Sequence, residues 1–545
     1  MKVCLAQINT RVGDVARNLQ RSIEALQSAR TSGAELVLFP ELSLMGYPPR
    51  DLLDYRSVVD ANLRALESLA AAAQGLTVVC GFVECNPSAA GRPFFNAAAV
   101  LKDGKHLATY RKRLLPYYDI FDEPRYFEAG GEPLVVDVGG ERLGITICED
   151  VWNVPGFLPR PYVCTALDEL TQLGVTLLVN LSASPFSLRK TEHRLDLFRE
   201  ISRKIGIPAV FCNQVAGQDE ILFDGGSFAL GASGELLAAA RVFEEELLFV
   251  DTKKPAPGTA VPWPRSEPEW LYRALSFGLR DYVKKCGGSK VCLGLSGGID
   301  SSVVAALAEE ALGKLAVSGV ALPTRFTSRE SLEDARELAS HLGLAFREIA
   351  VEGLFESFEH VWRATFGRAP SSLTSENLQP RIRMTLLMAI ANEEGRFLLN
   401  TSNKSEISSG YATLYGDAAG ALAVIGDLTK RQVYDLARYI NRNREVIPQR
   451  VLDRPPTAEL RENQTDQDTL PPYDLLDPIV EGLIEQSLGP AELEAKGLPP
   501  AAVRLAARLH ATSEYKRRQL PPVLRVSNRA FGVGRRMPIA AGTPD

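Results

Sequence analysis

Residues 290–302 carry the sequence KVCLGLSGGIDSS, a pattern typical of a strand, a glycine-rich loop and the start of a helix. Residues 290–295 form the apolar run expected of a buried strand. Apolar residues then recur on one helical face from residue 303 to residue 311, and a second apolar run covers residues 316–322. Two strands on either side of a helix predict a βαβ unit, and therefore a parallel, doubly wound sheet.

Another helix is predicted after the second strand. Thr327 and Glu330 have the spacing of a capping box, and Gly343 stands where a helix would end. An apolar stripe runs between them, as expected for a helix that packs on a sheet.

The loop at residues 296–302 combines glycines with hydroxyl side chains at the N-terminal end of a helix. Gly297 and Gly298 let the backbone approach an anion, while the helix N-terminus supplies unpaired N–H groups. Asp300 is an unexpected residue for an anion site unless it holds a Mg²⁺ ion that the anion shares. The loop matches neither Gly-x-x-x-x-Gly-Lys-Ser nor Gly-x-Gly-x-x-Gly.

This loop resembles the signature of the N-type ATP pyrophosphatases, which cleave ATP between the α- and β-phosphates. Five later blocks are similar to the NAD synthetase family, in the family's order: 400–406 (NTSNKSE), 410–417 (GYATLYGD), 427–430 (DLTK), 456–460 (PTAEL) and 470–473 (LPPY). The resemblance implies a Rossmann-like domain, ATP as co-substrate, Mg²⁺, and deamido-NAD⁺ as the carboxylate that is adenylated.

The resemblance also assigns residues to these ligands. It implies ATP contacts at Gly294, Ser296, Gly297, Gly298, Asp300, Ser301, Ser302, Thr401, Lys430 and Thr457. It implies deamido-NAD⁺ contacts at Asn377, Arg381, Arg383 and Glu406. Asp300 and Glu406 are hard oxygen ligands suited to one Mg²⁺, and Lys404 and Lys430 would neutralise charge on the α-phosphate and pyrophosphate. Pro380 is expected to shift the start of the helix beside it.

The N-terminal half also alternates apolar runs with amphipathic stretches. Buried strands are predicted at residues 35–39, 76–83, 143–147, 175–179 and 209–211. Helical patterns lie between them, which implies a layered α/β fold. Pro and Gly are dense between residues 253 and 264, so we expect a linker there. The predicted division is a domain at 1–254, a linker at 255–268 and a domain at 269–545.

Three short stretches of this half suggest a thiol hydrolase. They are 39–42 (FPEL), 110–116 (YRKRLLP) and 144–150 (GITICED). Attack of a cysteine on an amide needs a base for the thiol proton and a cation or donor for the oxyanion. Glu41, Lys112 and Cys148 supply these groups, and the charge of Lys112 is expected to favour a thiolate.

The three stretches resemble the nitrilase, or carbon–nitrogen hydrolase, superfamily over about residues 1–250. The resemblance implies a Glu41–Lys112–Cys148 triad and a four-layer α-β-β-α sandwich. In the glutaminase branch of that superfamily, the regions around Tyr118 and residues 182–186 line the glutamine pocket. Tyr118, Ser184 and Arg189 are therefore the predicted glutamine contacts.

The two halves have complementary chemistry. A glutaminase releases ammonia, and an adenylating amide synthetase consumes it. The expected reaction converts deamido-NAD⁺, ATP and glutamine (or ammonia) into NAD⁺, AMP, pyrophosphate and glutamate. The alternative is another adenylating glutamine amidotransferase of the N-type ATP pyrophosphatase group, with a different acceptor.

Composition limits the other possibilities. A net charge of −6 argues against a general nucleic-acid binder, and no run approaches the ~20 apolar residues of a membrane span. Eight scattered cysteines without a Cys-x-x-Cys pair favour a reducing, cytoplasmic compartment. The resemblance implies a homo-oligomer based on dimers, either a tetramer or an octamer. A basic tail is expected either to reach substrate phosphates or to be solvated: Lys516, Arg517, Arg518, Arg525, Arg529, Arg535 and Arg536.

Overall fold

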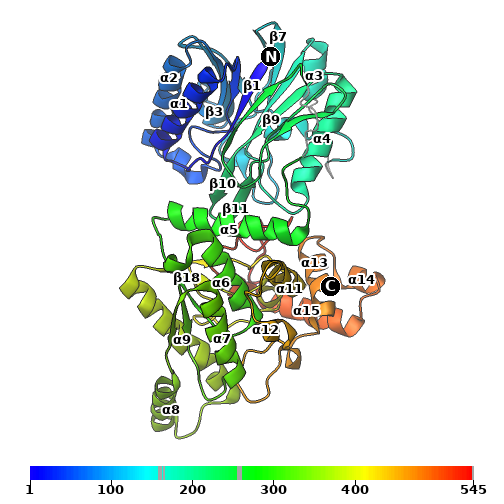
Figure 1. The fold of residues 1–545 in the computed structure, drawn as a ribbon. Helices are drawn as coiled ribbons and strands as arrows, with labels where there is room; N and C mark the ends of the chain where they lie inside the picture. The colour runs from blue at the N-terminus through cyan, green and yellow to red at the C-terminus, as the bar shows by residue number, and fades with distance from the viewer. Residues whose placement is uncertain (158–161, 164–165, 255–260, 543–545) are drawn as a thin grey trace. The chain divides into compact units, whose positions relative to one another are not determined.

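The computed structural model divides the chain into two units, Met1–Pro264 (unit 1) and Arg265–Asp545 (unit 2). It describes residues 1–157, 162–163, 166–254 and 261–542. The division falls within the predicted linker, where helix α5 (Glu267–Lys285) already begins. Figure 1 labels the helices and strands of both units. Among the helices of the described ranges, none combines the length and apolar composition that a membrane span requires.

Unit 1 contains two six-stranded sheets that pack against each other. The first sheet consists, in spatial order, of β14 (Glu246–Asp251), β1 (Lys2–Gln7), β2 (Leu36–Leu38), β3 (Thr77–Cys85), β4 (Phe94–Lys102) and β5 (Lys105–Arg111). The second consists of β13 (Leu236–Ala239), β12 (Phe228–Leu230), β9 (Ala209–Asn213), β8 (Leu177–Ser182), β7 (Glu141–Ile147) and β6 (Leu134–Val138). One apolar cluster joins side chains of both sheets, among them Val79 and Val179.

Helices cover the outer faces of these sheets (Figure 1). They are α1 (Val15–Thr31) and α2 (Arg56–Ala72) on the first sheet, and α3 (Ala166–Gln172) and α4 (Lys190–Ile205) on the second. Successive side chains of a strand point to opposite faces of its sheet. Val78 therefore packs in the cluster beneath α1 and α2, whereas Val79 packs between the two sheets. The predicted α-β-β-α sandwich is confirmed.

The strand directions bring several loops to one edge of each sheet. In the first sheet β2 and β3 are parallel, and β5 runs the same way because two antiparallel pairings separate it from β3. In the second sheet β7, β8 and β9 are parallel. The loops that follow β2, β5, β7 and β8 therefore leave from carboxyl ends, where catalytic groups are commonly built.

Unit 2 is built on one parallel sheet, as predicted. Its strands are, in spatial order, β17 (Ala345–Glu348), β16 (Val317–Ala321), β15 (Val291–Gly294), β18 (Phe397–Asn400) and β19 (Leu422–Ala423). The chain moves from β15 outward to β17 and returns to the other side of β15 at β18. This reversal is the switch point at which doubly wound folds bind ligands, outside the carboxyl ends of the strands.

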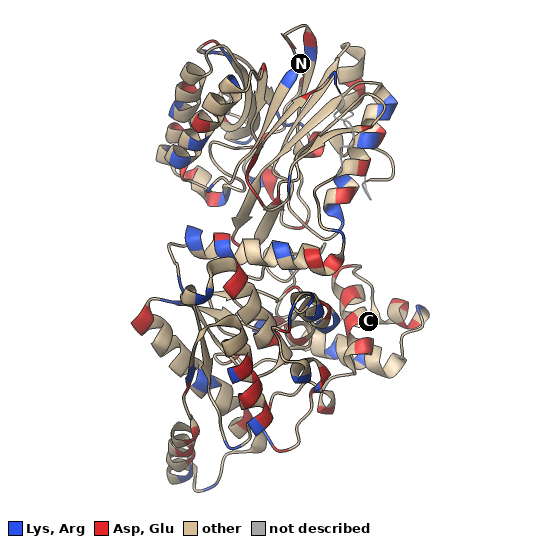
Figure 2. Ribbon diagram, in the orientation of Figure 1, with Lys and Arg blue, Asp and Glu red and all other residues tan. Residues whose placement is uncertain are grey.

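The helices of unit 2 lie around this sheet (Figure 1). They are α5, α6 (Ile299–Leu312), α7 (Arg329–Leu342), α8 (Glu352–Phe366), α9 (Ser372–Glu394), α10 (Lys404–Ser409), α11 (Lys430–Ile440), α12 (Gln449–Asp453), α13 (Tyr473–Ile484), α14 (Pro490–Ala495), α15 (Pro500–Thr512) and α16 (Glu514–Arg517). Figure 2 shows the charged residues mainly on helices, whereas the strands are mostly uncharged.

Two predicted helix starts differ from the structure. The cap of α7 is Ser328 rather than Thr327, because the Ser328 side chain accepts the N–H of Ser331 while the Thr327 hydroxyl accepts the N–H of Thr324. Gly343 ends α7 in the left-handed conformation, as predicted.

Pro380 does not mark the start of its helix. It lies inside α9, which begins eight residues earlier behind the Ser371 cap. A proline in a helix interior removes one backbone hydrogen bond, and tertiary packing overrides that local cost here, since Pro380 is buried.

The basic tail folds onto unit 2 instead of forming a free end. Arg517 donates to the carbonyl oxygens of Ser408 (2.9 Å) and His510. Arg535 contacts the His510 ring at 2.7 Å and Glu514 at 3.0 Å. Internal partners are likewise bound by Lys516, Arg518, Arg525 and Arg529.

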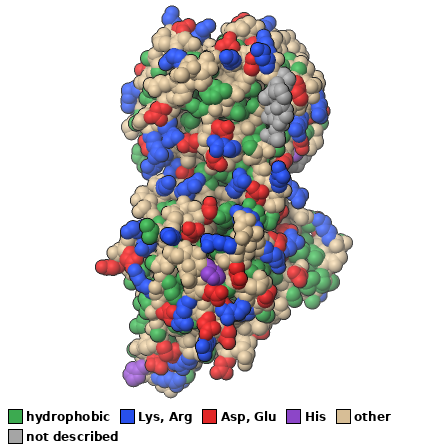
Figure 3. Space-filling view, viewed as in Figure 1, with side chains coloured by type: hydrophobic (Ala, Val, Ile, Leu, Met, Phe, Trp, Pro, Cys, Tyr) green, Lys and Arg blue, Asp and Glu red, His purple; other side chains and the backbone are tan. Residues whose placement is uncertain are grey.

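These internal bonds engage most of the tail's cations. On the face drawn in Figure 3, Lys and Arg are interspersed with Asp and Glu.

His510 makes the stability of unit 2 sensitive to acid. Burial and the charges of Arg517 and Arg535 lower its pKa to about 3. The unfolded chain therefore binds more protons than the folded one between about pH 6.5 and pH 3, and stability is lost as the pH falls through that range. From this residue alone, we expect the free energy of unfolding of unit 2 to be about 2 kcal/mol lower at pH 5 than at pH 7.

Urea unfolding of the His510→Gln variant at both pH values measures this contribution. Between pH 7 and pH 5, the free energy of unfolding of the variant should fall by about 2 kcal/mol less than that of the parent. His341→Gln, at a half-buried position in the same unit, is the control. An unchanged acid dependence in His510→Gln would contradict the prediction.

Candidate active sites

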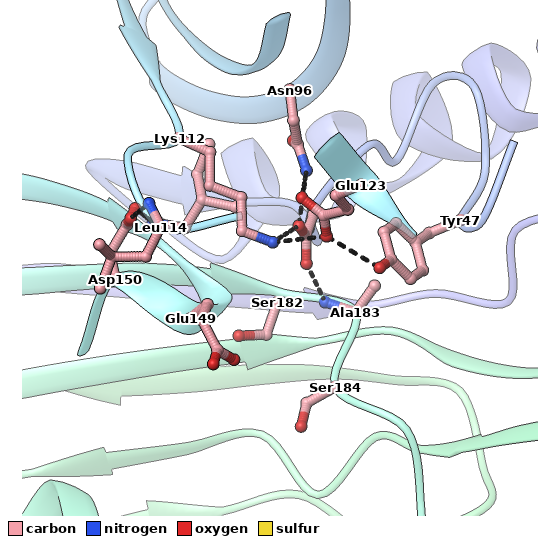
Figure 4. A network of polar contacts seen from close by, with 12 residues as sticks. Tyr47, Asn96, Lys112, Leu114, Glu123, Glu149, Asp150, Ser182, Ala183 and Ser184 are labelled. Carbon is pink, nitrogen blue, oxygen red and sulfur yellow. Dashed lines mark hydrogen bonds and ion pairs between the residues drawn. The ribbon is translucent and has the colours of Figure 1, made fainter. Parts of the chain in front are cut away.

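The first candidate site lies where four strand ends of unit 1 meet. Glu41 follows β2, Lys112 follows β5 and Cys148 follows β7. Ala183 follows β8 and donates its backbone N–H to Glu41, and Figure 4 shows it near Lys112. The structure therefore brings the predicted triad, which is separated by more than a hundred residues of chain, to one edge of the sandwich.

Lys112 is the centre of the polar network in Figure 4. Its Nζ lies 2.7 Å from Oε1 of Glu41 and 2.7 Å from Oε1 of Glu123. All three side chains are at most 4% exposed. Burial alone would lower the pKa of Lys112, but the charges of Glu123 and Glu41 outweigh it and raise that pKa well above its usual value. The lysine therefore stays an ammonium ion despite its burial.

The second carboxylate, Glu123, is a site residue that the sequence analysis did not single out. Its Oε1 accepts the Tyr47 hydroxyl at 2.8 Å, and Asn96 Nδ2 lies 3.4 Å from its Oε2. Burial raises the pKa of Glu123, and Lys112 opposes that rise. The residue begins a short 3₁₀ turn, Glu123–Arg125, five residues after Tyr118, and only its contact with Lys112 in the folded chain identifies it.

Glu41 is fixed at both carboxylate oxygens. Asn96 Nδ2 donates to Oε1 at 2.7 Å, and the backbone N–H of Ala183 donates to Oε2 at 2.9 Å. A carboxylate held in this way has a single orientation, which a general base requires.

Cys148 opens a short 3₁₀ turn, Cys148–Val151, with a backbone φ of 42°. Asp150 holds this turn, because its Oδ2 accepts the Ile147 N–H at 2.9 Å and its Oδ1 accepts the Leu114 N–H at 2.9 Å. The second bond ties the turn to the segment that carries Lys112.

The charge of Lys112 acts on the Cys148 thiol in the expected direction, toward a thiolate, but other groups outweigh it. Burial and the charge of Glu41 raise the pKa of Cys148 well above its usual value, and Lys112 only opposes that effect. The two carboxylates already neutralise the lysine. The nucleophile therefore depends on a base at the moment of attack.

Charged and aromatic groups surround the position beside Cys148. The hydroxyls of Tyr118 and Tyr162 donate to Glu149 Oε1 at 2.9 and 3.0 Å. The charge of Lys190 acts on Glu149, and its Nζ lies 5.9 Å from the Trp152 ring. The predicted contact Ser184 is buried nearby in Figure 4.

The predicted contact Arg189 differs from these residues in being exposed, at the left-handed N-cap of α4. Its neighbour Lys190 faces the aromatic rings and Glu149 instead. Glu149 and Lys190 are further site residues that sequence reasoning missed.

The second candidate site is a cavity of about 300 Å³ in unit 2, at the switch point of the sheet. Predicted ligand contacts that line it are Gly294, Ser296, Gly298, Asp300, Ser301, Arg383, Thr401, Glu406, Lys430 and Thr457. They come from the end of β15, the loop after it and the start of α6, from α9, from the loop after β18 and α10, from the start of α11 and from the segment before α13. These residues are distant in sequence, and the sheet topology brings them together.

Four other predicted contacts do not line the cavity. Gly297 has a φ of 77°, and a Cβ there would lie 2.0 Å from the Ser331 carbonyl oxygen, so this glycine permits close packing on α7. Ser302 Oγ donates to the Gly298 carbonyl at 2.8 Å. Asn377 accepts the Thr413 hydroxyl. Arg381 donates to the Leu414 carbonyl at 3.1 Å.

Lys430 joins two carboxylates in this cavity. Its Nζ lies 2.6 Å from Asp300 Oδ2 and 3.3 Å from Glu406 Oε1. Burial and the charge of Asp300 raise the pKa of Glu406, while Lys430 opposes that rise. Asp466, a third carboxylate, also lines the cavity and accepts the Tyr473 hydroxyl at 2.8 Å. One cation among three carboxylates leaves a site that favours further positive charge.

Lys404, expected at the phosphates, is not at the cavity. Its Nζ is fully buried 3.0 Å from Asp427 Oδ1 and 2.7 Å from Glu485 Oε1, and it donates to Ser527 Oγ at 2.9 Å. It anchors α10 to the C-terminal segment, so its role is structural.

Comparisons with known proteins match both units. The carbon–nitrogen hydrolase model matches residues 2–255, and the NAD synthase model matches residues 271–521. The chain is 42% identical to the glutamine-dependent NAD(+) synthetase of Thermotoga maritima, covering 99% of this chain and 98% of the relative. It is 41% identical to the enzyme of the same name from Synechocystis sp., with the same coverages.

Solved structures give the same picture. The glutamine-dependent NAD⁺ synthetase from Acinetobacter baumannii, in complex with ADP, is 37% identical with a TM-score of 0.78, covering 100% of this chain and 99% of its own. The synthetase from Cytophaga hutchinsonii, at 21% identity and a TM-score of 0.86, covers 100% and 98% and supports the fold alone.

Proposed function

The chain belongs to the family of glutamine-dependent NAD(+) synthetases, and on that premise we propose that unit 1 releases ammonia from glutamine and unit 2 uses it. The reaction is the ATP-dependent amidation of deamido-NAD⁺, which makes the protein a ligase. One observation supports this function above the others. The same chain contains a buried site with cysteine, lysine and glutamate and a cavity lined by the predicted ATP contacts. Membership in this family argues against the alternative considered from the sequence, an adenylating amidotransferase with a different acceptor.

In unit 1, Glu41 would take the proton of the Cys148 thiol as the sulfur attacks the side-chain amide carbon of glutamine. The Lys112 ammonium would stabilise the oxyanion of the tetrahedral intermediate. Glu41 would then return the proton to the departing nitrogen, releasing ammonia and leaving a thioester. A water molecule activated by Glu41 would hydrolyse the thioester to glutamate. The buried neutral thiol makes the base essential to the first step.

The α-ammonium and α-carboxylate groups of glutamine need charged partners. Glu149 offers a carboxylate, already bonded by two tyrosine hydroxyls, to the α-ammonium group. Lys190 offers its ammonium to the α-carboxylate. Tyr118 and Ser184 complete the proposed pocket, and Arg189 remains a proposed contact at its rim.

In unit 2, the loop after β15 would hold the ATP phosphates, with hydroxyls from Ser296 and Ser301 and further donors from Thr401 and Thr457. Lys430 would neutralise charge on the α-phosphate as the nicotinate carboxylate attacks it. Ammonia would then displace AMP from the acyl adenylate. The roles of Gly297, Ser302, Asn377 and Arg381 would be to shape this site.

The carboxylates Asp300 and Glu406 fit a magnesium ion. Mg²⁺ prefers oxygen ligands and is commonly bound by one or two carboxylates together with substrate phosphates. Both carboxylates line the cavity with the phosphate loop, so the ion would lie beside the phosphates of ATP. When bound, the ion would supply charge neutralisation on the phosphates.

The family membership also supports a proposal about the assembly. We expect a homo-oligomer built from dimers, as a tetramer or an octamer, located in the cytoplasm. Sedimentation velocity of the purified chain would give the number of subunits.

Cys148→Ala should abolish glutamine-dependent NAD⁺ formation and leave ammonium-dependent formation within about twofold, because no step in unit 2 uses the thiol. Glu41→Ala and Lys112→Ala should give the same pattern. Initial rates with each nitrogen donor measure it. Loss of both activities in folded protein would show that the division of labour is wrong, and retained glutamine activity would show that another nucleophile exists.

Asp300→Ala or Glu406→Ala should reduce NAD⁺ formation at least about 100-fold with either donor, since adenylation precedes the use of ammonia. The unit 2 variant Asp435→Ala, which removes an exposed carboxylate paired with Arg438, is the control. Pyrophosphate release measures adenylation directly. Near-normal synthesis from ammonium in either cavity variant would disprove the proposed metal ligands.

A further inference from the structure

A buried ion pair lies close to the first site but takes no part in its chemistry. Arg194 of α4 and Asp224 at the end of β11 (Ile221–Asp224) form a hydrogen-bonded pair whose side chains are 1% and 0% exposed. Thr191 joins them, donating to Asp224 Oδ2 at 2.6 Å and accepting from Arg194 Nη2 at 3.3 Å. Arg194 is among the largest fully buried side chains of the described protein.

Stability does not account for this pair. Removing two charges from water is costly, and replacing a buried ion pair by apolar residues is often neutral or stabilising. Two polar atoms here, Arg194 Nε and Asp224 Oδ1, also have no hydrogen-bond partner. A buried pair that adds little stability is better explained by the geometry it imposes on a neighbour.

The neighbour is the backbone of Ser184. Arg194 Nη1 donates to the Ser184 carbonyl oxygen at 3.3 Å. Asn213 holds the same residue, accepting the Ser184 N–H at 2.8 Å and donating to its carbonyl oxygen at 3.3 Å. Both backbone groups of Ser184 are therefore bound by buried side chains from α4 and β9.

The preceding residue, Ala183, carries the functional consequence. Its backbone N–H donates to Glu41 Oε2 at 2.9 Å, so its position sets the orientation of the general base. Figure 4 shows Ala183 and Ser184 on one short segment after β8. A shift at the Ser184 carbonyl would move both the donor to Glu41 and the Ser184 side chain.

We propose that Arg194, held by Asp224 and Thr191, is a positioning residue for glutamine hydrolysis that fixes the Ala183–Ser184 segment against Glu41 and the substrate. The proposal rests on the proposed glutaminase function of unit 1. Arg194 acts through Ser184 and does not touch the reacting atoms. The charge of Asp224 keeps the guanidinium oriented, and the Thr191 hydroxyl fixes the shared geometry.

Arg194→Lys is the first test. It keeps a positive charge beside Asp224, but its single nitrogen cannot replace the two guanidinium nitrogens that separately reach Asp224 and Ser184. We expect KM for glutamine to rise about tenfold and kcat with glutamine to fall about tenfold. Changes of this size correspond to the loss of one hydrogen bond from a charged donor. Ammonium-dependent kcat should stay within twofold. Arg199→Lys, at a half-buried arginine five residues further along α4, should change neither constant.

A KM effect separates positioning from loss of structure. A smaller folded fraction lowers kcat but leaves KM for glutamine unchanged. Unchanged KM in folded Arg194→Lys, or an equal change in Arg199→Lys, would overturn the proposal. An equal loss of ammonium-dependent synthesis would overturn it too. If the parent protein hydrolyses no glutamine at all, the proposed function itself has failed.

Thr191→Val provides a test if Arg194→Lys does not fold. Valine has nearly the same shape as threonine but lacks the hydroxyl that bridges Asp224 and Arg194. We expect KM for glutamine to rise about threefold, with Thr191→Ser restoring the parent value because it keeps the hydroxyl. Equal KM values in Thr191→Val and the parent would overturn the proposal.

Discussion

Each unit buries a lysine ammonium between two carboxylates at its candidate site. Lys112 is held by Glu41 and Glu123, and Lys430 by Asp300 and Glu406. An ammonium ion loses its hydration when it is buried, so it keeps its charge only if carboxylates approach within hydrogen-bond distance. This requirement forces chain segments far apart in sequence to meet, and the rest of each site is arranged around the resulting cluster.

The two clusters serve opposite purposes. In unit 1 the two carboxylates oppose the charge of the lysine, and burial together with Glu41 raises the pKa of Cys148 well above its usual value. In unit 2 a third carboxylate, Asp466, leaves an excess of negative charge that suits an incoming cation with its phosphates. The same pair of side-chain types thus supports nucleophilic catalysis in one unit and phosphate chemistry in the other.

Positioning in both units depends on buried polar groups rather than on the reacting groups alone. Asp150 ties the nucleophile turn to the lysine segment. Lys404 anchors α10, the six-residue helix that carries Glu406, to Asp427 and Glu485. Helices this short are not stable alone, so tertiary bonds must hold them. Such residues are easily mistaken for ligand contacts, because their side chains have the same chemistry.

The sequence by itself determined the fold class and both families, and it supplied the candidate catalytic residues, because these depend on local patterns. Apolar runs predicted β2, β3, β7, β15 and β16, and short motifs identified Glu41, Cys148 and Asp300. The tertiary structure alone decided which polar groups meet. The pair of Arg194 with Asp224 lies in segments that no motif marked, and the regions that contain Glu123 and Glu149 did not show which polar groups these two carboxylates would meet. Their roles depend on distances between strand ends and on burial, and these exist only once the sheets have packed.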